Sequence, residues 1–299
     1  YDNAIVKVYD IPIFYFPKFS HPDPSVDRRS GFLPPSFADT KNLGSSFELP
    51  YFWNINNDKD FTITPKLFVS EHPLILGEYR QAFLNSNLIL DLGFTEGYKN
   101  TSQTKKSGSK SHFFAKFVKS FTGENEAESN LELTLQNVSN DKYLKLYRID
   151  SNLVNYNTDT IENSFDFTHE SENLFFGFET SLYETLKEDY DDKYEYILPE
   201  ITFDKNLFNN EKIGILDLSS NYKVHNYDTN KLTNFLVNNL HWASRSISFD
   251  NGLNTKILGN LKNINYEAKN IDIYKNDFTS EIYGALGILS ELKLQKLNN

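Results

Sequence analysis

The chain has 299 residues, of which 24% are charged and 15% aromatic, and its formal net charge at pH 7 is −11. Proteins that bind nucleic acid usually present a basic face, so this charge argues against nucleic acid as a partner. The absence of cysteine excludes a disulfide framework and thiolate metal sites within the segment. No run approaches the roughly 18 to 20 apolar residues of a membrane-spanning helix.

The sequence also contains no methionine. We therefore expect a piece of a longer or processed protein, with any signal peptide outside the segment. Strands of a membrane β-barrel alternate between apolar and polar residues, so their average composition is polar. The polar composition is therefore compatible with an outer-membrane barrel.

The first distinctive stretch, residues 21–55, carries five prolines. Pro35 and Pro50 lie inside or beside runs that otherwise have the composition of strands. Proline has no N–H for a sheet ladder and is confined to edges, strand starts and bulges. Two successive strands that each contain a proline therefore need an explanation.

Further along, apolar residues recur at every second position, which is typical of strands with one apolar and one polar face. In one such row, Asp91 and Thr95 should face the polar interior of a barrel, and the apolar residues should face lipid. The rows are Phe61, Ile63, Pro65, Leu67 and Val69; Leu88, Leu90, Leu92 and Phe94; Leu131, Leu133 and Leu135; and Phe176, Phe178, Thr180 and Leu182.

Polar connectors separate these rows, at residues 99–110, 120–129, 186–194 and 207–213. We expect roughly a dozen strands beyond residue 30, each of about 8 to 14 residues, joined in sequence as antiparallel hairpins. A soluble β-sandwich alternates in the same way. The length of the strands and aromatic residues at their ends, such as Tyr51 to Trp53 and Trp242, favour the membrane barrel.

Ordered motifs near the start closely resemble the family of the LPS-assembly outer-membrane protein LptD, also known as the organic solvent tolerance protein. They are R-R-S-G-F-L at Arg28 to Leu33, P-Y-F-W-N-I at Pro50 to Ile55, and D-F-T-I-T-P at Asp60 to Pro65. Further similar segments occupy residues 77–84, 111–117, 137–149 and 196–203. The resemblance is dense over residues 9–150 and sparser to about residue 205.

This resemblance implies a periplasmic β-jellyroll followed by a large antiparallel transmembrane β-barrel. Residues 1–22 would be the last jellyroll strand and the hinge, and residues 23–299 the N-terminal half of the barrel. It also implies that the chain lies in the outer membrane with its N-terminal end in the periplasm. The implied partners are lipopolysaccharide, an LptE-like lipoprotein plug, a periplasmic LptA-like jellyroll bridge and outer-membrane lipids.

The function implied by the resemblance is insertion of lipopolysaccharide into the outer leaflet through a lateral gate between the first and last barrel strands. The gate prolines of the family fall on Pro35 and Pro50, and Pro34 is an additional proline beside them. An alternative is that these three prolines mark ordinary turns. Two other functions stay open: a passive porin or receptor barrel, and a soluble β-sandwich that binds a ligand.

Two further groups have open roles. An apolar group near the N-terminus would line the exit of an acyl-chain groove or pack an ordinary jellyroll core; it consists of Ile11, Ile13, Phe14, Phe16 and Phe19. Arg28 and Arg29 would form the hinge or meet lipid A phosphates, because arginine offers two parallel donors to phosphate.

No motif supports catalysis, so we expect no enzyme activity, catalytic residue or cofactor. The six histidines lack paired ligand spacing, and no metal site is expected; they are His21, His72, His112, His169, His225 and His241. The acidic run of Glu188, Asp189, Asp191 and Asp192 is interpreted as a solvated loop. Many members of the family join their two domains by disulfides, which this segment cannot do.

Overall fold

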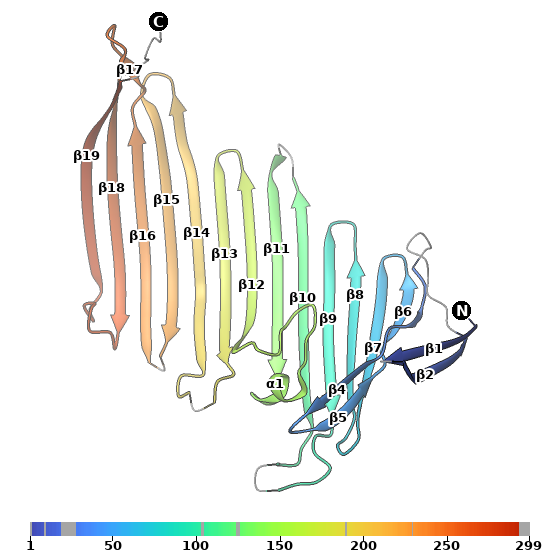
Figure 1. Cartoon of the computed structure of the whole chain (residues 1–299). Coiled ribbons are helices and arrows are strands. Elements are labelled where there is room, and N and C mark those ends of the chain that lie inside the picture. The colour runs from blue at the N-terminus through green and yellow to red at the C-terminus, as the bar shows by residue number, and fades with distance from the viewer. Residues whose placement is uncertain are drawn as a thin grey trace, which may run out of the picture.

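A computed structural model of the chain describes residues 2–8, 10–18, 28–102, 105–123, 126–188, 190–228 and 230–292 (Figure 1). Strands take up 67% of the chain and helix 2%, so the predicted all-β fold class is confirmed. The elements are β1 (Asp2–Val8), β2 (Ile11–Lys18), β3 (Gly31–Phe32), β4 (Ser36–Thr40), β5 (Gly44–Glu48), β6 (Tyr51–Asn56), β7 (Lys59–Phe68), β8 (Leu74–Ala82), β9 (Ser86–Thr95), β10 (Lys110–Thr122), β11 (Glu128–Val138), α1 (Tyr143–Tyr147), β12 (Thr160–Ser171), β13 (Leu174–Thr185), β14 (Tyr194–Asn210), β15 (Gly214–Tyr227), β16 (Lys231–Ala243), β17 (Ile247–Ser248), β18 (Leu253–Lys269) and β19 (Thr279–Leu292).

The first two strands form a small sheet of their own. β1 and β2 pair antiparallel, from Asp2 opposite Lys18 to Val8 opposite Ile11. Asp10, in the turn between them, has a φ of 65°, a left-handed conformation that Asp tolerates better than most residues. The sequence predicted one strand in this region, and the chain forms a hairpin instead.

All the other strands belong to a single antiparallel sheet in which each strand pairs with a near neighbour in the chain. The part of the chain that is described contains seventeen strands from β3 to β19, more than the dozen expected. Two of the expected strands are each divided into two halves, β3 with β4 and β5 with β6. The strand order would bring β19 beside β3 on closure, but no ladder pair joins them among the described residues. The sheet is open, as a partial barrel would be (Figure 1).

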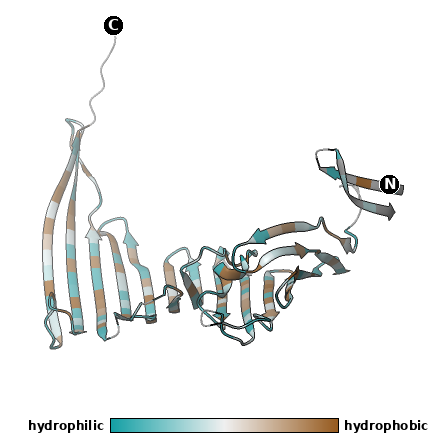
Figure 2. Cartoon of the chain, turned by 60° about the horizontal axis from the view of Figure 1, so that its bottom comes forward, coloured by the Kyte–Doolittle hydropathy of each residue, from teal (hydrophilic) through white to brown (hydrophobic). Residues whose placement is uncertain are grey.

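The two faces of this sheet differ in chemistry, and Figure 2 shows the resulting alternation of hydropathy along the strands. We define the inner face as the one that bears Asp60, Asp91 and His112, and the outer face as the opposite one. On β9, Leu92 and Phe94 point outward and are 43% and 54% exposed, whereas Asp91 is 3% exposed. Apolar side chains are thus exposed and polar ones buried, the reverse of a water-soluble sheet.

The hairpin connections differ in length at the two ends of the sheet. At one end they comprise residues 57–58, 83–85, 123–127, 172–173 and 211–213, and the segment 244–252 that contains β17. At the other end they comprise residues 41–43, 69–73, 96–109, 139–159, 186–193, 228–230 and 270–278. We refer to these as the short-turn end and the long-loop end.

The longest connection, residues 139–159, folds over the inner face and carries the helix α1. A five-residue helix is too short to be stable alone, so it depends on the packing of Tyr143, Leu144 and Tyr147, which are all buried. These side chains belong to the core cluster of the chain, which also contains Leu43, Phe68, Leu74, Phe114, Ile149, Val154, Ile161 and Leu186. The core therefore lies between this loop and the inner face near the long-loop end.

Polar contacts also attach the loop 139–159 to the wall. Lys66 Nζ donates to the carbonyl oxygen of Tyr147 at 3.0 Å. Asn152 Nδ2 donates to both carboxylate oxygens of Glu78, at 3.0 and 2.8 Å. The loop is consequently tied to β7 and β8 as well as to its own flanking strands.

This loop changes the expected surroundings of Asp91. The sequence correctly assigned Asp91 and Thr95 to the face opposite Leu92, but the loop buries them instead of leaving them in an open polar interior. His112 Nε2 lies 3.2 Å from Asp91 Oδ1, and His112 Nδ1 lies 3.2 Å from the Tyr143 hydroxyl. The His112 ring fits over Gly93, where an added Cβ would lie 2.3 Å from His112 Cε1.

Candidate functional site

The sequence-predicted prolines lie at breaks in the first two strands of the sheet. Pro34 and Pro35 fall between β3 and β4, and Pro50 falls directly before β6. β3 pairs with β6 through only Gly31 opposite Phe52 and Phe32 opposite Tyr51. The first strand, made of β3 and β4, and the second strand, made of β5 and β6, are therefore both interrupted.

The ladder at these breaks is incomplete because proline cannot donate. Leu33 N donates to the carbonyl oxygen of Pro50 at 2.9 Å, and Leu49 N donates to that of Pro65 at 3.3 Å. In an antiparallel ladder a hydrogen-bonded pair exchanges two bonds, so each of these pairs lacks its return bond. The missing return bond of Leu49 and Pro65 lies between the second strand and the third strand, β7, so the ladder is incomplete there as well.

The first strand also has an extra residue at its break. Three steps separate Leu33 from Ser36, whereas two separate Pro50 from Glu48, the ladder partner of Ser36. An unmatched residue of this kind is a bulge, which bends the strand and interrupts the ladder. Neither Pro34 nor Pro35 can donate to a neighbour on either side. The free edge of the sheet is therefore weakest at this level.

Beyond the break, β4 and β5 form a hairpin of five ladder pairs, from Ser36 opposite Glu48 to Thr40 opposite Gly44. The rings of Phe37 and Phe47 pack across it with centroids 5.0 Å apart. In Figure 1 the two strands run at an angle to β6 and β7. The prolines therefore mark a line at which the edge of the sheet changes direction.

The two candidate arginines have different surroundings. Arg28 forms an ion pair with Asp60, and its guanidinium lies 5.4 Å from the centroid of the Phe52 ring. Asp60 also accepts a hydrogen bond from Arg80 Nε at 2.9 Å. Arg29 is exposed. Arg28 thus contacts a carboxylate of the protein, and the sequence had singled out neither Asp60 nor Arg80 as its partner.

The proposed acyl-chain group is only partly described. The backbones of Ile11, Ile13, Phe14 and Phe16 lie in β2, and their side chains are not described. Phe19 lies outside the described residues. The role of this group stays a prediction.

The acidic run lies in the loop between β13 and β14, as expected. Glu188 pairs with Lys142 at 2.6 Å, and the neighbouring Lys193 contacts Asp141 at 3.0 Å and Glu184 at 2.9 Å. The hydrogen bonds that Lys193 donates to Glu184 and Asp141 raise its pKa. Asp189 lies outside the described residues. Ion pairs within the protein thus neutralise part of the acidic charge in and near this loop.

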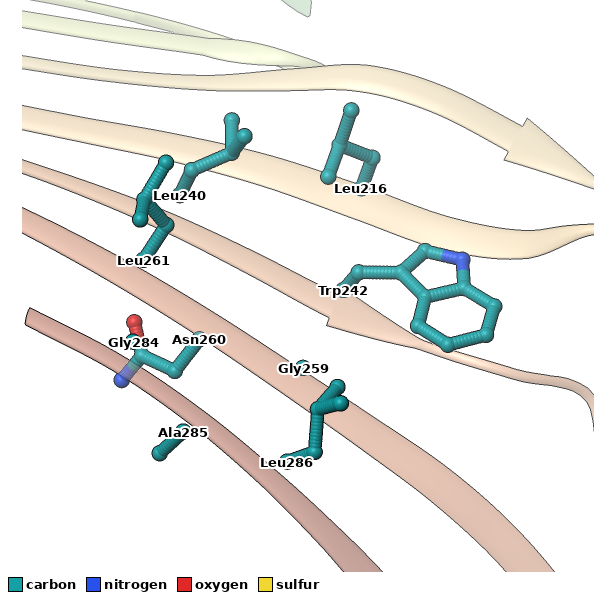
Figure 3. A pocket seen from close by; sticks show the side chains of 9 residues that line it. All are labelled: Leu216, Leu240, Trp242, Gly259, Asn260, Leu261, Gly284, Ala285 and Leu286. Carbon is teal, nitrogen blue, oxygen red and sulfur yellow. The ribbon is translucent and has the colours of Figure 1, made fainter.

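A hollow of about 490 Å³ lies on the outer face across β15, β16, β18 and β19 (Figure 3). These are among the last strands of the sheet, whereas the prolines lie in the first strands (Figure 1). Its lining consists of Leu216, Leu240, Trp242, Gly259, Asn260, Leu261, Gly284, Ala285 and Leu286. The Trp242 indole donates to the carbonyl oxygen of Ile213 at 3.1 Å. None of the sequence-predicted site residues lines this hollow.

The helical content of the chain is minimal. Within the described ranges, no helix has the length and apolarity needed to cross a membrane.

Comparison with known proteins finds several LPS-assembly proteins LptD that are similar to part of this chain. The LPS-assembly protein LptD of Pseudoalteromonas translucida is 32% identical over 160 residues, which are 53% of this chain and 20% of that protein. Those of Chromobacterium violaceum and Pseudomonas aeruginosa are 44% and 34% identical over 78 and 94 residues, 26% and 31% of this chain and 10% of each relative. No protein-family model matches the chain. The expected resemblance is confirmed for a partial chain, which spans a fifth or less of each relative.

Proposed function

Because the chain is assigned to the LPS-assembly protein LptD family as a partial chain, we propose that it is the N-terminal part of an outer-membrane barrel that inserts lipopolysaccharide into the outer leaflet. The lipid would leave through a lateral gate between the first and last barrel strands. The observation that carries this proposal is the free edge, where Pro34, Pro35 and Pro50 interrupt the first two strands and leave the ladder incomplete.

A gate needs a seam that opens at low cost. A closed barrel normally has no edge, and each net ladder bond contributes about 0.5–1.5 kcal/mol. The contribution is larger in hydrocarbon, where water cannot replace the lost partner. A first strand with a bulge and two prolines offers fewer bonds to a closing strand than any regular strand would. The acyl chains could then pass into the bilayer while the sugars stay in the polar interior.

The reversed burial pattern supports a lipid-facing outer surface. Leu92 and Phe94 are exposed on the same strand on which Asp91 is 3% exposed. In a soluble β-sandwich the apolar face would be the covered one. A passive porin or receptor also has a lipid-facing wall, but a uniformly paired wall would suit it better than an interrupted first strand.

The unequal connections support an orientation. Bacterial outer-membrane barrels have short periplasmic turns and longer extracellular loops. The short-turn end, which includes residues 57–58 and 172–173, would then be periplasmic and the long-loop end extracellular. Residues 1–22 would end a periplasmic jellyroll that receives lipopolysaccharide from an LptA-like bridge. An LptE-like lipoprotein would occupy the interior of the completed barrel.

A photo-crosslinking experiment in the full-length protein tests the gate. A photoreactive amino acid replaces Phe32, which is 69% exposed on the first strand, or Phe113, which is 40% exposed on β10. Both side chains lie on the outer face in one ladder row, which runs from Phe32 through Tyr51, Ile63, Gly77 and Leu92 to Phe113. We expect lipopolysaccharide to crosslink at position 32 and not at position 113. Equal crosslinking, or none at position 32, would overturn the lateral route.

A further inference from the structure

The base of the first strand is held by side chains as well as by the ladder. β3 contributes only two ladder pairs, to which the hydrogen bond from Leu33 N to Pro50 O adds a third contact. The segment directly before β3, residues 28–30, lies outside any strand. We refer to residues 28–30 as the anchor segment, because Arg28 and Ser30 contact Phe52, Asn54 and Asp60.

The centre of these contacts is the carboxylate of Asp60, whose side chain is 4% exposed. Arg28 Nη2 donates to Oδ2, and Arg80 Nε donates to Oδ1 at 2.9 Å. A buried carboxylate is costly unless it is paired and hydrogen-bonded, and here two guanidiniums share it. Removal of Arg28 would leave one of the two carboxylate oxygens without this donor.

Backbone groups of the anchor segment are held as well. Asn54 Nδ2 donates to the carbonyl oxygen of Arg28 at 2.6 Å, and Asn54 N donates to Ser30 Oγ at 2.9 Å. The Arg28 guanidinium lies over the Phe52 ring, which adds a cation–π contact. The anchor segment is therefore fixed along both its backbone and its side chains.

All these partners lie on the same side of the first strand. Asn54 is the ladder partner of Asp60, and Asp60 is the ladder partner of Arg80, so the three form one row across β6, β7 and β8. The clamp, which we define as Arg28, Asn54, Asp60 and Arg80, thus ties the first strand to the second, third and fourth strands. Of these four residues only Arg28 belongs to the segment that leads into the first strand, and Asn54, Asp60 and Arg80 lie on strands away from the free edge.

We propose that Asp60 is a positioning residue of the gate: through Arg28 it holds the base of the first strand to the second, so that the barrel parts at the free edge. This inference rests on the proposed function. The first and second strands are themselves weakly paired, because the pair of Leu33 and Pro50 lacks its return bond. Without the clamp, the first strand would separate from the second strand as readily as from the closing strand.

The clamp can be tested by replacing it with a covalent bond. Phe32 and Tyr51 are ladder partners, and their ring centroids lie 5.1 Å apart. Opposed residues in an antiparallel pair have Cα atoms about 4.5–5.5 Å apart, which suits a disulfide. The segment has no cysteine of its own that could compete. Phe32→Cys with Tyr51→Cys therefore joins the first and second strands at the level that the clamp controls.

The experiment measures delivery of lipopolysaccharide to the cell surface by the full-length protein. Arg28→Ala should lower delivery about tenfold, the scale of a hydrogen bond to a charged group, and Arg28→Lys should lower it less because the charge remains but the planar stacking is lost. Arg29→Ala, at the exposed neighbouring arginine, should leave delivery unchanged. Oxidation of the cysteine pair in the Arg28→Ala or Arg28→Lys background should restore delivery, and reduction should abolish the rescue. Phe32→Cys alone controls for loss of the aromatic pair.

Two results would overturn the proposal. Arg28→Ala with normal delivery would mean that the clamp is dispensable. A loss in Arg28→Ala that the oxidised pair cannot restore, in a barrel that still shows heat-modifiable migration, would mean that Arg28 acts directly on the cargo. If the parent protein itself delivers no lipopolysaccharide, the proposed function fails and not the clamp, so the two failures are distinguishable.

Discussion

The substitutions Pro50→Ala and Pro35→Ala test whether the incomplete ladder matters for function. Leu33 N already donates to the carbonyl oxygen of residue 50, so the two backbones are aligned as a hydrogen-bonded pair. Alanine would restore the missing N–H, which could donate back to Leu33. We expect a gain of one ladder bond, about 0.5–1.5 kcal/mol. This corresponds to a factor of about 2 to 13 in the equilibrium between the paired and the separated states of the first and second strands. The gain would be larger in lipid.

The full-length Pro50→Ala barrel should lose its heat-modifiable form at an equal or higher temperature and keep normal delivery of lipopolysaccharide, because the added bond joins the first strand to the second, as the clamp does. Pro35→Ala added to it gives the first strand a donor that a closing strand could accept. In this double variant stability and export should change in opposite directions: the barrel stays folded, while delivery falls and cells become sensitive to large hydrophobic antibiotics. Pro73→Ala is the matched control, since Pro73 is exposed in a loop outside the ladder. A well-folded barrel that carries both Pro35→Ala and Pro50→Ala and exports normally would refute this reasoning, and misassembly as the primary defect would indicate turn prolines.

Four further substitutions test the two faces of the sheet and the loop over the inner face. Leu92→Arg should lower barrel stability by about 2–4 kcal/mol if Leu92 lies near the bilayer midplane. Asn87→Arg, on the inner face of the same strand, should lower it much less. Equal losses of stability in a membrane refolding titration would contradict the assignment of Leu92 to the lipid-facing side. Gly93→Ala should displace His112, because the added Cβ would lie 2.3 Å from its ring, and protease cleavage within residues 139–159 should increase while the strands stay protected. Burial raises the pKa of Tyr147 to about 12. The contribution of the neutral phenol to docking of residues 139–159 is therefore complete below about pH 10 and lost as the pH rises through 12, where the loop should open. Tyr147→Phe should remove this opening at high pH, and an unchanged pH profile would exclude Tyr147 as its source.

The alternating rows and the proline spacing made much of the sheet predictable. Period-2 patterns are local, so they located β7, β9, β11 and β13 and assigned Leu92 and Asp91 to opposite faces. Pro35 and Pro50, which the sequence had singled out, lie at breaks between strands. Both features depend on residues that are adjacent or nearly adjacent in the chain.

The parts that the sequence did not predict depend on register across several strands. Asp60 becomes the partner of Arg28 only because β6, β7 and β8 align Asn54, Asp60 and Arg80 in one row. Helix α1 has no intrinsic stability at five residues and exists through its tertiary packing. The burial of Asp91 follows from that packing. A local pattern could therefore predict the sheet face on which Asp91 lies, but not the loop that buries it.

The sequential hairpins of the sheet have a consequence for the order of folding. Most ladder contacts join neighbours in the chain, and closing such short loops costs little entropy, so the wall can grow one hairpin at a time. The hydrogen bond between Lys66 and Tyr147 instead spans 81 residues. It can form only after β7 through β11 are aligned, which makes docking of residues 139–159 a late step. Pulse-labelled amide exchange during refolding should therefore protect the β8–β9 hairpin before α1.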